Sequence, residues 1–183
     1  MRWKWQAYHP DGLPTNQLID LLYRNLPSLC PFAVRAADDL PTKRLGQRPI
    51  AIIVNTDVSS REGSHWTALY IPSAPSHPEF FCSGGGDMPE TVDAFFTRQG
   101  ARRCHTLYSE DLIQDPFSNT CGMFCVDFLA YRANHAGTIY DYVGRFRRDS
   151  YEYNERELTR FWNARDDVSS LTFKALDAPD STH

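Results

Sequence analysis

The chain has 183 residues, of which 42% are hydrophobic and 23% charged, and this composition is typical of one soluble globular domain. Its formal net charge of −4 excludes a strong overall attraction to nucleic acid. There is no apolar run near the roughly 20 residues that cross a membrane, and no signal-peptide segment after Met1, so we expect an intracellular protein without a membrane partner.

The first predicted element is a helix from Leu13 to Leu26, because its leucines recur at helical spacing. Thr15 or Asn16 is the expected N-terminal cap, and Pro27 ends the helix. A proline-rich connection is expected from Leu26 to Pro49.

The middle of the chain reads as strands. The continuous β-branched run from Ile50 to Val54 predicts a buried strand, and a polar turn follows from Asp57 to Ser64. The alternating segment from His65 to Ile71 predicts a second strand. Shorter strands are expected from Glu79 to Ser83 and from Arg103 to Tyr108.

Helices dominate the second half. Gly84-Gly85-Gly86 breaks the preceding strand, and Asp87 and Glu90 are spaced as a capping box for the next helix. The most apolar helix is expected from Cys121 to Asn134, and one or two more between Tyr140 and Ala164.

Central strands with helices at both ends predict an α+β fold, with a mixed or antiparallel sheet flanked by helices. We expect one domain over residues 1–165 and a flexible tail over residues 166–183, where the periodicity is lost.

The cysteine count indicates a reducing compartment rather than a disulfide framework. An odd number of cysteines in a chain of this size is a poor basis for structural disulfides. The five are Cys30, Cys82, Cys104, Cys121 and Cys125.

Cys121 is the strongest functional candidate, because it lies where a loop turns into an apolar helix. The backbone N–H groups of a first helical turn stabilise a thiolate and can hold an oxyanion. His65 supplies a base, and Gln114 supplies an amide donor. Taken singly, these residues read as a buried cysteine, a hydrogen-bonded strand histidine and a loop glutamine. Their joint arrangement favours acyl transfer to a cysteine.

The same residues resemble a known family. Gly63-Ser64-His65-Trp66, then Gln114 followed seven residues later by Cys121-Gly122, resembles adenain, the adenovirus-type cysteine endopeptidase. Proteases that process ubiquitin-like modifiers share these elements, but their glutamine lies one residue nearer the cysteine. The spacing therefore favours the adenain branch.

Other positions extend the resemblance over residues 50–132. The run from Ala51 to Thr56 is similar to the stretch before the family's histidine, and Cys104 and Cys125 fall where adenain has cysteines. The resemblance implies a papain-like or adenain-like α+β fold, with the nucleophile at the N-terminus of a buried helix. It also implies polypeptide substrates, namely viral capsid or core precursor proteins, and hence a location in the host cell, including the nucleus, and in the virion.

The resemblance also implies residue roles. Cys121 would be the nucleophile and His65 the general base. The side-chain amide of Gln114 and the backbone N–H of Cys121 would form the oxyanion hole. Asn55, Ser64 and Trp66 would lie beside the substrate cleft and bind substrate, although Trp66 is also compatible with the core.

Cys104 has two readings of equal weight. In adenain the corresponding cysteine forms a disulfide with a short activating peptide, whereas a strand cysteine can simply pack in the core. An activating peptide is therefore the one cofactor that the resemblance implies. A zinc site built from Cys104, His105, Cys121 and Cys125 is disfavoured, because their spacing is not that of a structural zinc site. We expect no metal.

The chain departs from the family at its third catalytic position. There an Asp or Glu lies 17 residues after the histidine and orients the imidazole, whereas here the residue is Cys82. A thiol is a poor hydrogen-bond acceptor and is mostly neutral near pH 7. Three explanations compete: a working Cys121–His65 dyad, which we favour, a substitute carboxylate such as Asp87, or an impaired enzyme.

Two other functions remain open. An isopeptidase that removes ubiquitin or a ubiquitin-like modifier such as SUMO would use the same residues. A protease fold that has lost activity through Cys82 would serve as a binding module instead.

Overall fold

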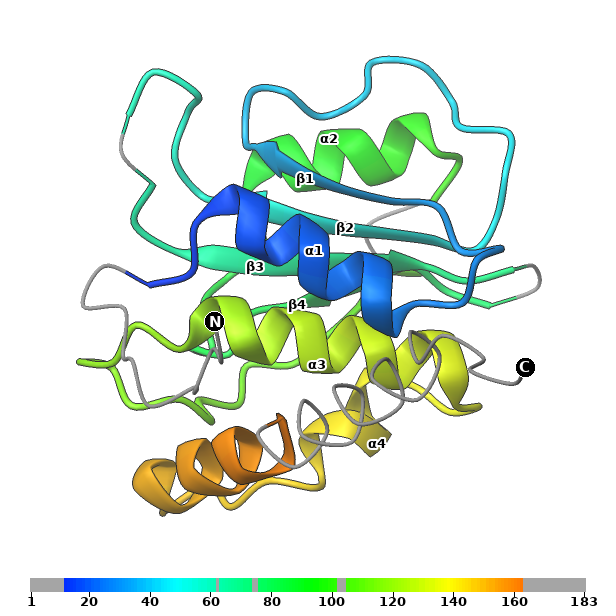
Figure 1. The fold of residues 1–183 in the computed structure, drawn as a ribbon. Helices are drawn as coiled ribbons and strands as arrows, with labels where there is room; N and C mark the ends of the chain where they lie inside the picture. The colour runs from blue at the N-terminus through cyan, green and yellow to red at the C-terminus, as the bar shows by residue number, and fades with distance from the viewer. Residues whose placement is uncertain (1–11, 62, 74–75, 102–104, 163–183) are drawn as a thin grey trace, which may run out of the picture.

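A computed structural model describes residues 12–61, 63–73, 76–101 and 105–162 of the chain, and within them five strands form one sheet in the order β1-β2-β3-β4-β5 (Figure 1). The central pairs β2–β3 and β3–β4 are antiparallel, while the outer pairs β1–β2 and β4–β5 are parallel. The predicted α+β architecture with a mixed sheet is therefore confirmed. The strands are β1 (Phe32–Ala36), β2 (Ile50–Asn55), β3 (Trp66–Ile71), β4 (Glu79–Phe81) and β5 (Leu107–Tyr108).

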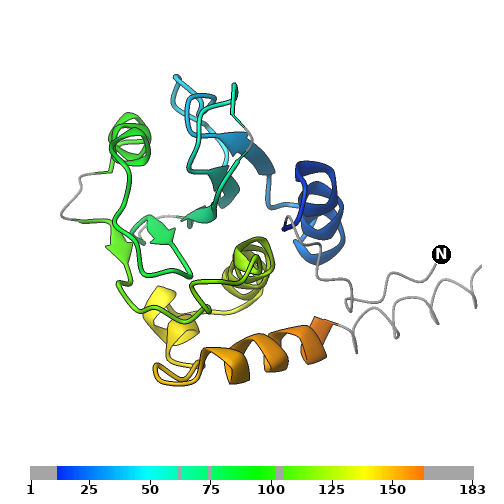
Figure 2. The same cartoon turned by 90° about the vertical axis from the view of Figure 1, so that its left-hand side faces the viewer.

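Helices cover both faces of the sheet, with α1 and α3 on one face and α2 on the other (Figures 1 and 2). Strand β2 is buried along its whole length, because alternate side chains enter two different cores. Ala51 and Ile53 pack with the core that contains α1 and α3, whereas Ile50, Ile52 and Val54 pack with the core that contains α2. The helices are α1 (Thr15–Asn25), α2 (Glu90–Arg98), α3 (Cys121–Asn134) and α4 (Ile139–Val143), and residues 151–162 are helical as well.

Strand β1 was not predicted, because it lies inside the expected proline-rich connection. Its side chains do not alternate cleanly between buried and exposed, and only Val34 is fully buried. Main-chain pairing with β2, in which Ala33 lies opposite Ile52, holds this edge strand in place. The strand therefore depends on tertiary pairing and not on a local pattern.

Both predicted helix caps are wrong. Helix α1 begins at Thr15 itself, and α2 begins at Glu90, so Pro14 and Pro89 occupy the cap positions and make no side-chain cap. The restricted φ of proline, −73° at Pro14, is compatible with entry into a helix and needs no side-chain acceptor.

The expected tail at 166–183 lies outside the described residues. The same holds for residues 103 and 104 of the strand expected from Arg103 to Tyr108, and for residues 163 and 164 at the end of the helical region expected from Tyr140 to Ala164. Across the described part of the chain, no helix is long and apolar enough to cross a membrane.

Candidate active site

Cys121 is the first residue of α3, as expected. It is only 6% exposed, and every residue from Cys121 to Ala130 is buried. The helix's own hydrogen bonds begin with the N–H groups of Met123 and Phe124, which both donate to the carbonyl of Thr120. The N–H groups of Cys121 and Gly122 therefore precede the helical ladder, where donors can serve a bound anion.

Gly122 allows the chain before α1 to approach the start of α3. A Cβ at this position would lie 3.2 Å from both Leu13 Cβ and Leu18 Cδ2. The carbonyl of Leu13 also accepts a hydrogen bond from the indole Nε1 of Trp66 at 3.0 Å. Leu13 thus links the first turn of α3 to the start of β3, the strand that follows His65.

The electrostatics favour a neutral Cys121 thiol in the resting state. Burial raises the pKa of Cys121, and hydrogen bonds from the backbone of Trp66 and Gly122 offset part of that rise. The interaction with the Trp66 backbone brings the nucleophile candidate beside the residue that follows His65. Because the thiol is neutral, attack requires a base that removes its proton.

His65 and Cys82 lie together. Nε2 of the imidazole is 3.2 Å from Sγ of Cys82, and the backbone N–H of Gly86 donates to the same sulfur at 3.3 Å. Burial lowers the pKa of His65 and raises that of Cys82, so both groups favour their neutral forms. Asp87, the substitute carboxylate considered above, is exposed, and the side chain at the imidazole is that of Cys82.

Gln114 is buried on the loop before α3, at 4% exposure, and its amide is held from two sides. Ser83 Oγ donates to Oε1 at 2.6 Å. Nε2 donates to the carbonyl of Ser118 at 2.9 Å and lies 3.2 Å from its Oγ. The amide therefore has a defined orientation, and its amino group faces the loop that leads into Cys121.

The three residues expected beside the substrate cleft differ in their surroundings. Asn55 is buried at 8% exposure, and its Oδ1 accepts a hydrogen bond from Asp57 N at 2.9 Å. Its Nδ2 would lie 1.5 Å from a Cβ at Gly63, so glycine is required there. Ser64 is exposed. Trp66 is half-buried and packs against the main core.

Three residues that hold the loop before Cys121 were not predicted from the sequence, namely Ser83, Ser118 and Glu155. Each is a common polar residue without a local motif. Glu155 lies 37 residues after Ser118, yet the two side chains are hydrogen-bonded. Only the folded chain brings them together.

The remaining expectations concern Cys104 and metals. Cys104 lies outside the described residues, and so its two readings stay open. Within the described ranges, no three His, Cys, Asp or Glu side chains come together in a way that could hold a metal ion.

No family model and no curated protein sequence matches the chain. Among solved structures, its fold is similar to that of the ASFV pS273R protease, a viral cysteine protease of the SUMO-protease-like fold. The match to the selenomethionine form of that protein has a TM-score of 0.54 and 17% sequence identity, and it covers 84% of this chain and 67% of that chain. A second structure of it has a TM-score of 0.53 and 18% identity, with the same coverage of both chains. This likeness establishes the fold.

Proposed function

We propose that the chain is a cysteine endopeptidase in which Cys121 attacks the carbonyl carbon of a peptide bond. The observation that carries the proposal is the position of Cys121 at the start of a buried helix, against the backbone of Trp66, the residue that follows His65. The fold shared with a viral cysteine protease supports the same reaction class. The adenain-like branch remains a prediction, since the neighbours named above are pS273R proteases.

The proposed reaction begins with proton transfer from Cys121 to His65. Because Nε2 is the nitrogen that faces Cys82, Nδ1 is the nitrogen that remains for the thiol. A proton on Nε2 that is donated to the Cys82 sulfur leaves Nδ1 with a lone pair, as a base requires. Gly86 N–H already donates to that sulfur, so Cys82 acts as an acceptor in this arrangement.

Attack by the thiolate forms a tetrahedral oxyanion and then an acyl-enzyme. The backbone N–H of Cys121 and the Nε2–H of Gln114 would stabilise the oxyanion. The imidazolium of His65 gives its proton to the leaving amine, and water then hydrolyses the thioester. For Gln114 to take part, one Nε2–H has to turn from the carbonyl of Ser118 toward the substrate, while the other keeps its contact with Ser118 Oγ.

The proposed substrates are polypeptides, in particular precursors of viral capsid or core proteins, processed in the host cell or the virion. An activating peptide attached through Cys104 belongs to the same proposal. The isopeptidase reading has a specific support, because the structural neighbour has the SUMO-protease-like fold.

One panel experiment tests the endopeptidase proposal. The purified chain is incubated with a peptide library, with a panel of ubiquitin-like modifiers linked to lysine, and with a cysteine-reactive probe. We expect cleavage of library peptides, measured by mass spectrometry, and probe attachment at Cys121. Cleavage confined to modifier linkages would instead favour the isopeptidase. Absence of both cleavage and selective labelling would support the binding module.

Substitution of Cys82 should show how far the missing carboxylate limits the turnover rate. We expect Cys82→Asp to raise kcat by about tenfold, because a carboxylate holds imidazolium more strongly than a thiol does. The turn after Cys82 can accept the charge, since the backbone N–H groups of Gly84, Gly85 and Gly86 all lower the pKa of the side chain at position 82. Steady-state kinetics on a cleaved peptide measure the change.

The pH dependence gives a second readout of the same substitution. The thiolate of Cys121 forms as pH rises through its raised pKa, so alkylation by iodoacetamide accelerates with pH. An aspartate at position 82 stabilises imidazolium, which in turn stabilises the thiolate, and the midpoint should therefore move to lower pH. Cys82→Asn is the matched control of similar size without the charge. Equal kcat and equal midpoints in the wild type and Cys82→Asp would show that the dyad is self-sufficient.

A further inference from the structure

The loop before Cys121 is hydrogen-bonded to the helical segment 151–162 through one carboxylate oxygen. Oε1 of Glu155, a residue that is 8% exposed, accepts hydrogen bonds from three residues of this loop. The backbone N–H of Asp115 donates at 3.1 Å, Thr120 Oγ1 donates at 2.9 Å, and Ser118 Oγ donates in a short contact. A single buried side chain thus holds both ends and the middle of the segment between Gln114 and Cys121.

The donor and the acceptor of each of these hydrogen bonds can be assigned. A carboxylate accepts hydrogen bonds, and a serine hydroxyl has one hydrogen to give. Because Ser118 gives its hydrogen to Glu155, its lone pairs face the amino group of Gln114 at 3.2 Å. On the other side Ser83 donates to the carbonyl oxygen of the same amide. Gln114 Nε2–H thus donates to Ser118 Oγ, and Ser118 Oγ–H in turn donates to the carboxylate of Glu155.

Asn154 adds a second tie from the neighbouring position. Its Nδ2 donates to the carbonyl of Ile113 at 3.0 Å and to the carbonyl of Arg147 at 2.7 Å, and the side chain is 1% exposed. Ile113 directly precedes Gln114. Two consecutive side chains therefore hold the backbone on both sides of the glutamine.

We propose that Glu155 is a positioning residue, which acts through Ser118 to set the orientation of the Gln114 amide in the oxyanion hole. The inference rests on the proposed function, since it assigns Gln114 to the oxyanion. A reversed amide would aim its carbonyl oxygen at the developing negative charge and would raise the barrier. The preorganised orientation of a donor is what gives an oxyanion hole its catalytic effect.

Kinetics of Glu155 variants test the proposal. We expect Glu155→Ala to lower kcat by about 10-fold to 100-fold with little change in KM, because the oxyanion forms only after substrate binding. Glu155→Gln should recover most of the loss, since its Oε1 can still accept. Glu152→Ala is the control, because Glu152 is an exposed glutamate on the same helical segment and should leave kcat unchanged.

A double-mutant cycle separates positioning from general destabilisation. If Glu155 acts through Gln114, then Glu155→Ala should lower kcat by less than about twofold in a Gln114→Ala background. Ser118→Ala removes only the hydroxyl between them and should reproduce a loss that also vanishes in that background. An unchanged kcat in both single variants, or the full loss in the Gln114→Ala background, would overturn the proposal. Ser118→Ala carries the test if Glu155→Ala does not fold.

Hydrogen exchange distinguishes a failure of this inference from a failure of the proposed function. Backbone amides between Ile113 and Thr120 should exchange faster in Glu155→Ala than in the wild type or Glu152→Ala, whether or not the chain cleaves peptides. A wild type that cleaves nothing would refute the proposed function and with it the catalytic role, while faster exchange would still show the tie to the loop. Equal exchange and equal kcat in an active enzyme would refute the positioning role alone.

Discussion

Cys121→Ala is expected to lower kcat by at least about four orders of magnitude, because it removes the thiol that is proposed to form the acyl-enzyme. The substitution removes one sulfur from the first residue of α3, a position where alanine also suits the helix. The fold should therefore survive, and circular dichroism should show an unchanged spectrum. Turnover is measured on a peptide that the wild type cleaves, and covalent labelling is measured by mass spectrometry of the peptide that contains Cys121.

Cys125 provides the matched control, since it lies one turn further along the same helix. Its side chain is fully buried and donates to the carbonyl of Trp66 at 3.3 Å, and burial raises its pKa well above the ordinary value. Cys125→Ala should consequently keep its probe labelling at Cys121 and most of its kcat, although it loses some stability. Full cleavage by Cys121→Ala, or labelling of Cys125 in the wild type, would refute the nucleophile assignment.

The helix that carries Cys121 could be predicted from sequence with its correct bounds, whereas strand β1 could not. Cys121–Asn134 is predominantly apolar and is buried without interruption over its first ten residues, so local pattern and tertiary environment agree. Strand β1 has no such agreement, because its five residues are stabilised by pairing with β2. Sequence periodicity reports burial on a face, and an edge strand that is half exposed gives little of that signal.

The same contrast applies within the candidate site. The pairing of His65 with Cys82 follows from two strands that are adjacent in sequence and in the sheet, where Ala68 lies opposite Phe81. Glu155 had no comparable signal, since it reaches the loop from a helical segment far along the chain. Hydrogen bonds between distant polar side chains depend on the whole fold, and residue type alone does not predict them.

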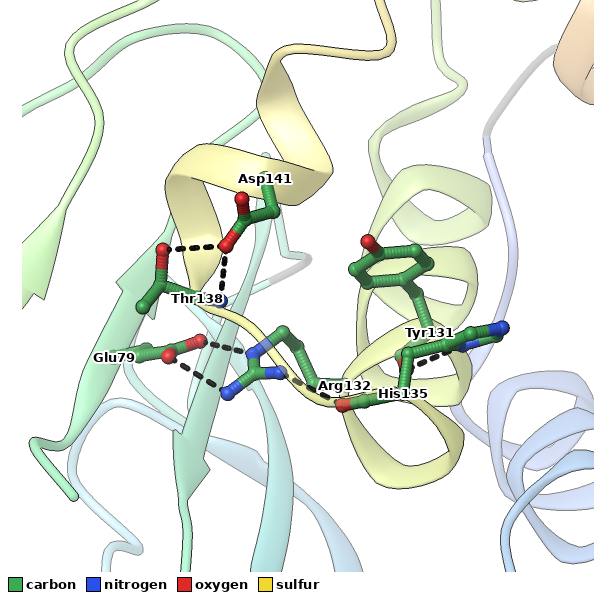
Figure 3. A network of polar contacts seen from close by, with 6 residues as sticks. All are labelled: Glu79, Tyr131, Arg132, His135, Thr138 and Asp141. Atoms are coloured by element: carbon green, nitrogen blue, oxygen red, sulfur yellow. Dashed lines mark hydrogen bonds and ion pairs between the residues drawn. The ribbon is translucent and has the colours of Figure 1, made fainter.

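A buried ion pair holds together the opposite end of α3, where Arg132 points from the helix toward Glu79 on β4 (Figure 3). The two form a bidentate pair, with Nε to Oε2 at 2.7 Å and Nη2 to Oε1 at 3.0 Å. Their side chains are 5% and 2% exposed. Arg132 also donates to the carbonyl of His135 at 3.1 Å and lies over the ring of Tyr70, at 5.2 Å from its centroid. The pair thus joins the sheet, α3 and the turn toward α4.

Arg132→Ala is expected to lower the free energy of unfolding by about 3–5 kcal/mol, because it leaves the Glu79 carboxylate buried without its counter-ion. Arg24→Ala is the control, since its pair with Asp20 is 61% and 53% exposed and should contribute less than about 1 kcal/mol. Urea unfolding measures both, and kcat of the folded fraction should be unchanged, as this pair lies at the end of α3 remote from Cys121.

The pH dependence of that loss identifies its cause. Burial already raises the pKa of Glu79 from 4.5 against the opposing effect of Arg132, and removal of the arginine leaves burial unopposed by that charge. The folded variant then holds the Glu79 proton to a higher pH than the unfolded chain does. Its stability is therefore greatest below the unfolded pKa and falls as pH rises through the folded pKa. The loss caused by Arg132→Ala should be smaller near pH 5 than near pH 8. A loss that does not vary with pH would assign the effect to packing around Tyr70 rather than to the uncompensated carboxylate.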